Sequence, residues 1–420
     1  MANASRETAS EQAELADPLK QSGVHQMPRW AIGVDAGSNG RAPRDHDAVV
    51  IGAGMAGLAT ALALKDRGVH SLVIDRADRV GSSWRQRYEG LRLNTWRRFS
   101  QLPDRPFQKG TSTFPTRVEV IDYLEHHAGE DGFDLRFRAA AERIERDGGS
   151  WVVRTTAGDL SAPAVVVSTG SENRPVIPDW KGRNGWSGQI VHSSEYRNAE
   201  PFRGREVLVA GSGSSGMEIA SELAEAGAAR VWLAVRTPPN ILGRRGPAGI
   251  PGDVIAVALW HLPAWFGDRF TRFARRADFG DLSEYGLPVP DEGVISRARR
   301  LGRAPAIVDE AVIEKIKAGR IEVVAGVEAF DAEGIELADG NRVEPDAVIC
   351  ATGFRRALEP LVCGLDVLDE EGVPLVRGGE PAADGLFFVG FVPRPGGLGF
   401  MAKEAKRVAK SIARRPAHRG

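Results

Sequence analysis

The sequence Gly52-Ala53-Gly54-Met55-Ala56-Gly57 directly follows four apolar residues at 48–51, and Gly211-Ser212-Gly213-Ser214-Ser215-Gly216 directly follows another four at 207–210. Both stretches have the spacing G-x-G-x-x-G, and a helical pattern follows each. In this fingerprint the first glycine makes a tight turn, the second admits a pyrophosphate, and the third lets helix pack on strand. The helix N-terminus then offers N–H groups to the phosphates. Two such stretches predict two nucleotide sites in one chain.

The bulk composition is that of an ordinary soluble globular protein. The 420 residues leave room for two or three domains, and 55 basic against 56 acidic side chains give no sign of nucleic-acid binding. Only Cys350 and Cys363 occur, which excludes a disulfide scaffold, a four-cysteine metal site and a C-x-x-C redox pair. The small number of cysteines suits a reducing cytoplasm. The sequence contains no uninterrupted run of about 18 apolar residues, so we expect no integral membrane span.

The order of expected elements repeats along the chain. Each half runs from glycine turn through helix, charged residue, hairpin and apolar strand to Thr-Gly. We predict an α/β fold of two Rossmann-like domains, the second inserted in the first, each with a small β-meander. Residues 1–44 are expected to be a disordered tail, 45–175 to begin the first domain, 176–325 to form the second, and 326–420 to return to the first and end in a helix.

The end of the second strand in each half predicts which dinucleotide binds there. In the first half this strand ends at Asp75, where a carboxylate binds ribose hydroxyls and would repel a 2′-phosphate. The following Arg76 is assigned to the same site. In the second half the strand ends at Arg236, and a cation suits the 2′-phosphate of NADP. Arg244 and Arg245 either add to that phosphate site or are solvated loop charges.

Further candidates lie at other strand ends and in one aromatic loop. Apolar strands end at Thr169-Gly170, at Thr352-Gly353 and at Gly390, and a helix expected over residues 402–413 follows the last of them. Its N-terminus could face a pyrophosphate or a flavin. Trp84 and Trp96 either line a flavin or fill the core.

Residues 253–279 interleave apolar and aromatic side chains with arginines. One interpretation is a surface helix that touches lipid or covers a substrate channel. The other, which we favour from the sequence, is a helical excursion packed on the body of the protein.

A third motif stands just ahead of the second glycine stretch. Trp186, Gly188, His192, Tyr196 and Arg197 have the spacing W-x-G-x-x-x-H-x-x-x-Y-R. This resembles the F-x-G-x-x-x-H-x-x-x-Y/F-K/R fingerprint of the flavin-containing monooxygenases, most of all their YUCCA-like group. The likeness runs from about residue 45 to the C-terminus and includes the similar stretches 351–354 and 385–391. It departs in having Trp186 for Phe, and Ser214 where the family usually has Asn, while the tyrosine at 196 argues against the Baeyer–Villiger branch.

The resemblance implies roles for residues already singled out. FAD would bind at Gly52, Gly54, Gly57 and Asp75 with Trp84 nearby, and NADPH at Gly211, Gly213, Ser214, Ser215, Gly216 and Arg236. Asn94 would face flavin and nicotinamide as the catalytic candidate, and His192 would be structural, linking the domains. The implied mechanism is hydride transfer from NADPH to FAD, addition of O₂ to give a C4a-hydroperoxyflavin, and insertion of one oxygen atom into a small organic substrate. That substrate is an aryl-pyruvate, decarboxylated oxidatively, or an amine or sulfide.

Two other classes of protein share such domains. A pyridine-nucleotide disulfide reductase needs a redox cysteine pair near the flavin, which Cys350 and Cys363 do not supply. The alternative of a regulatory flavin-binding protein remains. It would be favoured if the rate of NADPH oxidation did not rise with any candidate substrate.

Overall fold

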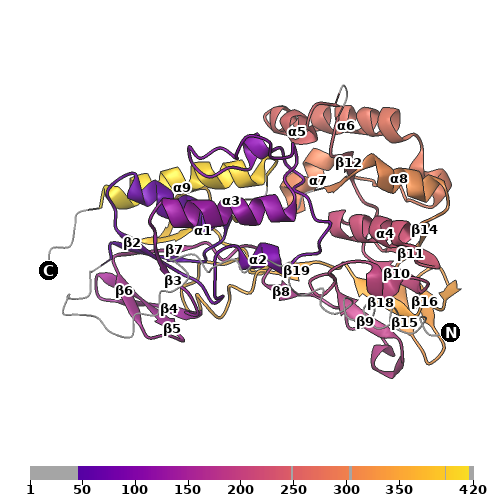
Figure 1. Cartoon of the computed structure of the whole chain (residues 1–420), viewed down its shortest axis with the longest axis horizontal. Coiled ribbons are helices and arrows are strands. Elements are labelled where there is room, and N and C mark those ends of the chain that lie inside the picture. Colours follow the sequence, from indigo (N-terminus) through magenta and orange to yellow (C-terminus); the bar gives the residue numbers. More distant parts are fainter. Residues whose placement is uncertain (1–45, 247–248, 302–304, 393, 416–420) are drawn as a thin grey trace, which may run out of the picture. The chain divides into compact units, whose positions relative to one another are not determined.

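The computed structural model describes residues 46–246, 249–301, 305–392 and 394–415, and the predicted tail over 1–44 lies outside them. Two parallel sheets organise the described chain, and each is covered by helices on one face and by a small antiparallel meander on the other (Figure 1). The prediction of two Rossmann-like domains, each with a meander, is confirmed.

The first sheet has the order β20-β21-β7-β1-β2-β3, in which only the edge strand β20 is antiparallel. Helix α1 is buried from Met55 to Leu64 and packs against α9, the C-terminal helix. The opposite face of the sheet packs on the first meander through Val165, Leu72 and Trp151. The elements are β1 (Ala48–Ile51), α1 (Met55–Lys65), β2 (Ser71–Ile74), α2 (Ser82–Arg85), α3 (Arg117–Glu130), β3 (Asp134–Arg136), β4 (Ala141–Asp147), β5 (Ser150–Thr155), β6 (Leu160–Ala162), β7 (Ala164–Val167), β20 (Pro381–Ala383), β21 (Leu386–Phe388) and α9 (Gly397–Ala413).

The second sheet has the order β14-β11-β10-β18-β9 and is parallel throughout. Val209 and Leu233 on one face pack against α4 and α8, while Leu208 and Trp232 on the other pack against the second meander. The elements are β9 (Gln189–His192), β10 (Glu206–Ala210), α4 (Ser214–Ala226), β11 (Arg230–Val235), α8 (Glu310–Lys317), β14 (Glu322–Ala325), β15 (Val327–Phe330), β16 (Ile335–Leu337), β17 (Arg342–Val343) and β18 (Ala347–Cys350).

The predicted return to the first domain at residue 326 is wrong. Strand β18 pairs along β10, and the preceding meander packs on the same sheet, so the second domain continues to about residue 350. The chain crosses between the domains at one short antiparallel pair, β8 (Arg174–Pro175) with β19 (Phe354–Arg355). The strand pairing therefore puts the return crossing after β18, later in the chain than the sequence placed it.

Local signals predicted several elements well. Thr116 and Glu119 have the sequence spacing of a capping box: Thr116 Oγ1 accepts the backbone N–H of Glu119 at the start of α3, and the Glu119 carboxylate accepts the backbone N–H of Thr116. The hairpin turns after Asp147 and at Asp339-Gly340 connect the expected strands. Helix α9 begins at Gly397, several residues before the predicted start, because Gly396 with φ +70° forms its N-cap.

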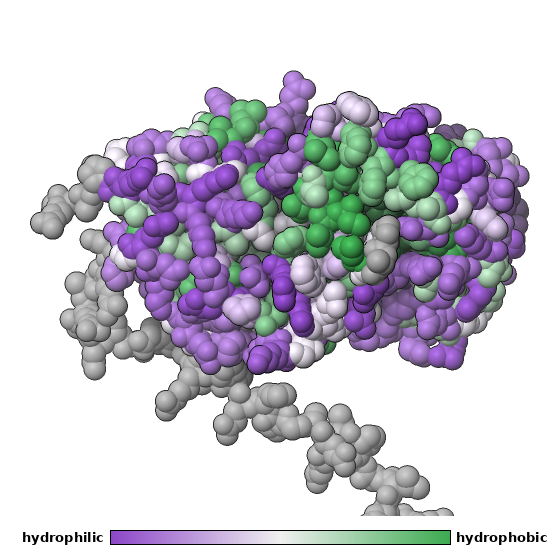
Figure 2. Space-filling view, turned by 90° about the horizontal axis from the view of Figure 1, so that it is seen from above, coloured by the Kyte–Doolittle hydropathy of each residue, from purple (hydrophilic) through white to green (hydrophobic). Residues whose placement is uncertain are grey.

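The excursion within the second domain is two helices, α5 (Gly252–Trp260) and α6 (Ala264–Phe279), followed by α7 (Val294–Leu301) and joined to the body by the parallel pair β12 (Ile241–Gly243) and β13 (Ala306–Val308). The sequence favours a helical excursion packed on the body, and the buried side of α6 does pack on α7 near Gly267, but most of its aromatic side chains are exposed. Trp265 is 69% exposed and Phe273 is 74% exposed. The face over α5 and α6 accordingly shows a hydrophobic patch (Figure 2). None of the described helices is both long and apolar enough to cross a bilayer.

Candidate active site between two glycine turns

The first glycine turn has the geometry that a dinucleotide requires. Gly52 adopts φ +110°, and a Cβ there would lie 2.7 Å from the carbonyl oxygen of Ser168. At Gly57 a Cβ would lie only 1.7 Å from the carbonyl oxygen of Gly52, so helix and turn are in direct contact. A Cβ on Gly54 would meet no atom within 4 Å, and because the N-cap of α1 is a glycine, no side chain caps the start of this helix. The N–H groups of the first helical turn are therefore accessible beside Gly54, which fits a pyrophosphate.

The second glycine turn repeats this construction. Gly211 adopts φ +120°, and a Cβ there would lie 2.4 Å from the carbonyl oxygen of Ala351. A Cβ on Gly216 would lie 1.9 Å from the carbonyl oxygen of Gly211, while one on Gly213 would meet nothing within 4 Å. Gly213 is the uncapped N-cap of α4. Both turns thus leave open the one position where a phosphate approaches the backbone.

Residues around the first turn are held close to it. Asp75 accepts hydrogen bonds from the backbone N–H of Ala53 at 2.6 Å and of Ala77 at 2.8 Å, so its carboxylate lies beside the turn. Trp84 is half-buried on α2, and that helix is tied to the turn by the N–H of Gly81 and the carbonyl of Ala53. Arg76 is exposed and makes no hydrogen bond or salt bridge with the described residues, so nothing in the structure supports its assignment.

At the second turn, the neighbouring strand β11 ends in a basic residue, whereas the corresponding strand β2 of the first domain ends in an acidic one. Arg236 follows β11 and is exposed, and a Cβ on neighbouring Gly326 would lie 2.9 Å from its Cα. Ser214 in the first turn of α4 accepts the N–H of Ile307 at 2.9 Å, so its hydroxyl hydrogen remains available to a ligand. Ser215 follows it in the same helical turn.

The strand-end candidates divide into two groups. Thr169 Oγ1 is buried without a hydrogen-bond partner among the described residues, and the chain at Thr169 lies against Gly52. An unsatisfied buried hydroxyl beside the open turn fits a bound ligand, and Gly170 follows it with φ +77°. Gly390 also lies close to the first turn, since a Cβ there would be 3.2 Å from Ala56, but its N–H is committed to Glu404.

The groups at Thr352-Gly353 bond to segments of the second domain, just beside the pair of β8 and β19 where the chain crosses between domains. The Thr352 hydroxyl donates to the carbonyl of Val176, and the carbonyl of Gly353 accepts from Val176 N–H and from His192 Nε2. The Thr352 hydroxyl and the Gly353 carbonyl are therefore already bonded within the protein, and the predicted contacts of these two residues with a cofactor would have to use their other backbone atoms.

Asn94 lies where the two domains meet. Its Oδ1 accepts bonds from Arg244 Nε at 3.3 Å and from Arg244 Nη2 at 3.1 Å. Arg244 is only 4% exposed and forms salt bridges with Glu218 of α4 and with Asp309. Tyr88 donates its hydroxyl to the same Glu218. The loop of the first domain is thus joined to the helix that starts at the second glycine turn.

This network corrects both expectations for Arg244. Its guanidinium is neither solvated nor free for a phosphate, because Asn94, Glu218 and Asp309 occupy it. Arg245 is exposed, with its guanidinium 5.4 Å from the centre of the Phe114 ring. Burial raises the pKa of Glu218, and the charge of Arg244 opposes that rise.

The motif at 186–197 is structural in the described chain. His192 is fully buried, its Nε2 bonds to the carbonyl of Gly353 at 3.0 Å, and its Nδ1 accepts the N–H of Ser194 at 3.1 Å. These partners fix the neutral ring, and burial lowers the pKa of His192. Trp186 packs edge-on against Phe330 of the second meander.

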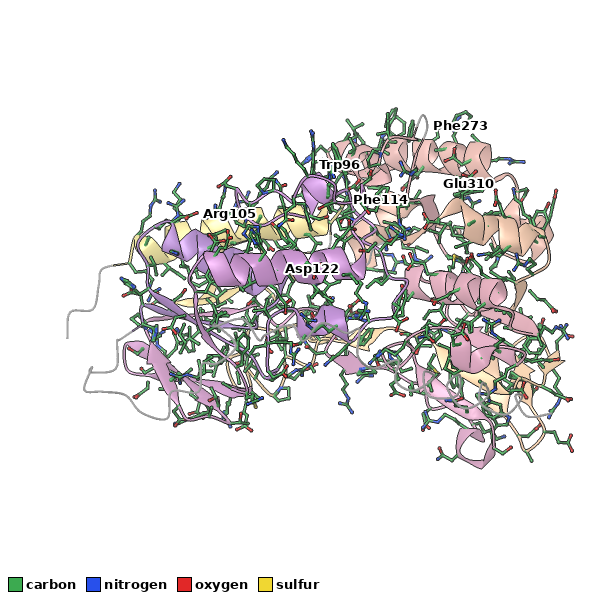
Figure 3. All side chains as sticks on the ribbon, in the orientation of Figure 1. Trp96, Arg105, Phe114, Asp122, Phe273 and Glu310 are labelled. Atoms are coloured by element: carbon green, nitrogen blue, oxygen red, sulfur yellow. The ribbon has the colours of Figure 1, made fainter. Side chains whose placement is uncertain are left out.

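Sequence reasoning missed Asp253. This residue in the first turn of α5 is 4% exposed and accepts the backbone N–H of Trp96 at 2.8 Å, while its Oδ1 is buried without a partner among the described residues. The chain beside Trp96 is bonded to the chain beside Phe114, because the N–H of Arg97 donates to the carbonyl of Thr113 at 2.9 Å (Figure 3 labels both aromatic residues). Burial raises the pKa of Asp253. No local pattern near residue 253 points to residue 96, which is distant in sequence.

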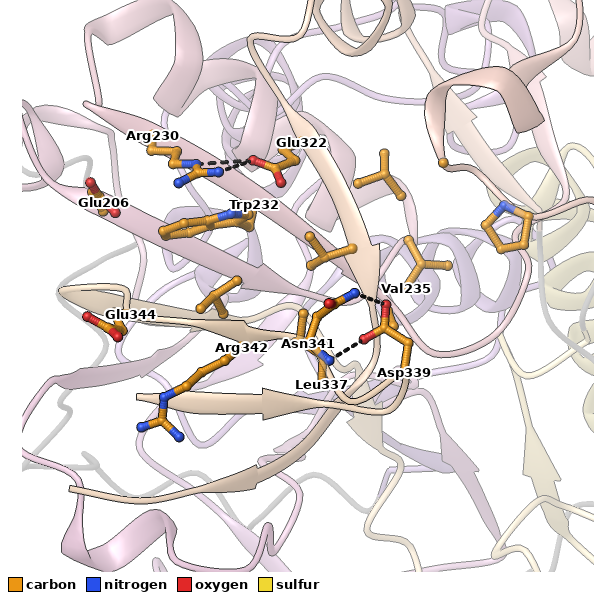
Figure 4. Close-up of a pocket in the computed structure, with 16 residues that line it drawn as sticks. Glu206, Arg230, Trp232, Val235, Glu322, Leu337, Asp339, Asn341, Arg342 and Glu344 are labelled. Atoms are coloured by element: carbon orange, nitrogen blue, oxygen red, sulfur yellow. Dashed lines mark hydrogen bonds and ion pairs between the residues drawn. The ribbon is translucent and has the colours of Figure 1, made fainter. Parts of the chain in front are cut away.

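A groove of about 890 Å³ lies between the second sheet and its meander (Figure 4). Arg230, paired with Glu322, and Trp232 line it, and neither glycine turn, Asn94 nor Arg244 does. Its position places it outside the candidate active site.

Comparisons with known proteins agree with this geometry. The family model for pyridine nucleotide-disulphide oxidoreductases matches residues 49–241. Indole-3-pyruvate monooxygenase YUCCA1 of Oryza sativa subsp. japonica is 36% identical over 374 residues, covering 87% of this chain and 91% of that protein. Probable indole-3-pyruvate monooxygenase YUCCA9 of Arabidopsis thaliana is 33% identical over 376 residues, covering 87% and 88%. A flavin-containing monooxygenase structure from Stenotrophomonas maltophilia is 22% identical with a TM-score of 0.67, covering 88% of this chain and 98% of that one, which shows the shared fold.

The disulphide-oxidoreductase model matches the glycine turns but not a redox centre. Cys350 is buried, which raises the pKa of its thiol to about 12, and Cys363 is exposed and likewise unpaired. Identity above 30% over most of both chains decides the family. The chain belongs to the flavin-containing monooxygenases, a family of FAD- and NADPH-dependent oxygenases, and within it to the YUCCA-like group.

Proposed function

We propose that this chain binds FAD at the turn of Gly52, Gly54 and Gly57 and NADPH at the turn of Gly211, Gly213 and Gly216, and that it oxidatively decarboxylates an aryl-substituted 2-oxo acid. The observation that carries the proposal is the bridge from Asn94 through Arg244 to Glu218, which links the loop of one nucleotide domain to the first helix of the other. The relatives named indole-3-pyruvate monooxygenases support the substrate class.

Bound FAD would take a hydride from NADPH and activate O₂, so the protein's task is to position the reactants and exclude water. One oxygen atom enters the carboxylic acid product, the other leaves as water, CO₂ is released and NADPH is oxidised. Asp75 would bind the FAD ribose, and Arg236 the 2′-phosphate of NADPH.

Asn94 would present a fixed hydrogen-bond donor. Because Arg244 holds Oδ1 by two N–H groups, the Asn94 NH₂ group must point away from the guanidinium, and it makes no bond within the described chain. This orientation suits an acceptor atom of cofactor or substrate. Arg244 acts through Asn94 and is a positioning residue.

The test uses purified full-length protein. We expect a yellow protein that releases FAD on denaturation, and NADPH consumption that rises with aryl-pyruvates while CO₂ and the shortened acid form in equal amounts. A colourless protein would contradict the cofactor assignment. Faster turnover with amines or sulfides, without CO₂, would replace the 2-oxo acid by N- or S-oxygenation. The scarcity of cysteines supports a cytoplasmic setting as part of the same proposal.

A further inference from the structure

Helix α6 carries its aromatic residues on the outside. Trp265 and Phe273 are 69% and 74% exposed, and Phe266 and Phe270 are exposed as well. The residues that α6 buries are small or polar, chiefly Gly267, Asp268 and Thr271, with Phe279 at the end. A surface helix normally has the opposite arrangement, with its apolar side toward the core.

The inner face of α6 explains how the helix is held without its aromatic residues. A Cβ on Gly267 would lie 2.8 Å from Ile295 Cγ1, so α6 and α7 approach closely there. Asp268 accepts the backbone N–H groups of Ile295 at 2.6 Å and Ser296 at 3.2 Å, which caps the start of α7. Folding therefore gives no reason for the exposed aromatic residues of α6.

A basic stripe runs beside the aromatic one. Arg269, Arg272 and Arg276 recur at i, i+3 and i+7 and are exposed, and no acidic side chain of the described chain forms a salt bridge with them. Phe266, Phe270 and Phe273 recur at i, i+4 and i+7 on the neighbouring arc. The two stripes form one surface with an excess of positive charge. Asp281, just after α6, lies close enough that Arg276 helps its hydrogen bonds with Ser283 to lower its pKa.

The patch extends beyond α6. Leu262, in the link from α5, is 41% exposed, and Ile250, just before α5, is 45% exposed. Figure 2 shows a hydrophobic patch on the face over the two helices, and Figure 3 shows Phe273 pointing away from the body.

We propose that α6, with Ile250 and Leu262 beside it, docks in the plane of a membrane surface that contains anionic phospholipid. Aromatic side chains next to an arginine stripe are the pattern of helices that lie at the bilayer interface. The unpaired guanidinium groups match negatively charged headgroups. The 16 residues of α6 make a helix of about 24 Å, which is too short to span a bilayer and suits an in-plane position.

Charge complementarity favours lipid over a protein partner or a second copy. A second copy would bring the same arginines against one another across a symmetric interface. The proposal goes beyond the oxygenase function, and its test measures binding, so it can fail independently of any result on substrates.

The experiment is flotation of the FAD-loaded full-length protein with vesicles. We expect flotation with vesicles of phosphatidylglycerol and phosphatidylcholine, little with phosphatidylcholine alone, and weaker binding as salt concentration rises. The double variant Trp265→Ser/Phe273→Ser should lower the partition coefficient more than about tenfold. The triple variant Arg269→Gln/Arg272→Gln/Arg276→Gln should lower it roughly fivefold per arginine on anionic vesicles.

The matched control is Val118→Ser/Leu375→Ser, which removes two apolar side chains that are 53% and 58% exposed elsewhere. It should float like the parent, and all variants should keep their FAD content and helical circular dichroism. The proposal is overturned if the parent does not float with anionic vesicles or if the aromatic variant floats equally well. It is also overturned if light scattering shows a dimer that the aromatic variant dissociates, because the face is then a self-interface.

Discussion

The two glycine turns are nearly identical in backbone and differ in what surrounds them. In each, the first glycine has φ above +100°, the third touches the carbonyl of the first, and the middle one faces open space. The differences lie at the end of the second strand, Asp75 against Arg236, and in the first turns of the helices. The shared backbone fits a dinucleotide in each turn, and the proposed function assigns the choice between FAD and NADPH to the two strand-end side chains.

Helices α1 and α4, which follow the two glycine turns, differ in their contacts with the rest of the protein. Counted from the first glycine of its turn, Ala59 of α1 corresponds to Glu218 of α4. Ala59 is buried among apolar residues beneath the C-terminal helix, whereas Glu218 binds Arg244 and Tyr88. Of the two positions, Glu218 of α4 has a side-chain connection to the Asn94 loop through Arg244, and Ala59 has none within the described residues. Helix α4 of the second domain is thus linked by side-chain bonds to the loop of Asn94, whereas α1 of the first domain packs through apolar contacts.

The largest effect is expected from substitutions of the third glycine in each turn. Gly57→Ala and Gly216→Ala place a methyl group less than 2 Å from the carbonyl oxygen of the first glycine of their turns. Each should cost more than about 3 kcal/mol of folding free energy, because backbone rather than a flexible side chain must move. Thermal unfolding and the yield of FAD-bound protein measure this.

Gly54→Ala and Gly213→Ala are the controls, because their methyl groups meet nothing within 4 Å. Both should fold, yet Gly54→Ala should lose FAD and Gly213→Ala should weaken NADPH while FAD stays bound. Loss of NADPH binding in Gly54→Ala with FAD retained would reverse the assignment of the two sites.

A smaller effect tests the link between the domains. Arg244→Lys keeps the charge but loses the fork that holds Asn94 Oδ1 and the carboxylates together. Product formed per NADPH should fall roughly tenfold to a hundredfold, with H₂O₂ released instead, since small displacements at a reacting centre are costly. Oxygen consumption, H₂O₂ and product are measured together.

Arg245→Lys is the matched control, since its side chain is exposed and outside the network. If Arg244 acts by positioning Asn94, the double variant Asn94→Ala/Arg244→Lys should be no worse than Asn94→Ala alone. Additive losses would show that Arg244 acts on the reaction by another route.

The sequence predicted the parts of the fold that local signals encode. The glycine spacing, the capping box of Thr116 and the hairpin turns are contained within a few residues each. The return of the chain at 326 failed because strand pairing between β18 and β10 joins residues far apart in sequence. The same limit applies to the site, where Asn94, Glu218 and Arg244 meet only through the tertiary fold.

The orientation of α6 could not be predicted from the sequence for a different reason. Its pattern of apolar and basic residues is visible in the sequence, but the pattern alone does not say which side faces the protein. The close approach at Gly267 and the cap from Asp268 decide this, and both depend on α7.

The contrast between Asp75 and Arg236 gives the next prediction. Arg236→Ala should weaken NADPH by about 1.5–3 kcal/mol, or roughly tenfold to a hundredfold, and leave NADH nearly unchanged. Titration of the enzyme with each nucleotide measures this. The control Arg230→Ala removes the arginine at the other end of β11, where it pairs with Glu322. Equal losses for both nucleotides would mean that Arg236 is not the phosphate ligand.

The smallest expected effect concerns His192, which supports the second turn without touching it. Because burial lowers its pKa, the folded protein keeps the ring neutral while the unfolded chain takes up a proton near pH 6.5. Its contribution to stability is therefore complete above that pH and is lost as the pH falls toward the folded-state pKa. The free energy of unfolding should decrease by up to about 1.4 kcal/mol per pH unit from this group.

His192→Asn should remove that part of the slope, and denaturant titrations between pH 7 and pH 5 compare the variant with the parent. Ser194→Ala is the control, because it deletes a hydroxyl but keeps the imidazole and the backbone N–H that Nδ1 accepts, so its slope should match the parent. The variant should also keep the parent's pH dependence of kcat, since both ring nitrogens are committed to backbone groups of the protein. A changed kcat profile with an unchanged stability slope would instead assign His192 to proton transfer.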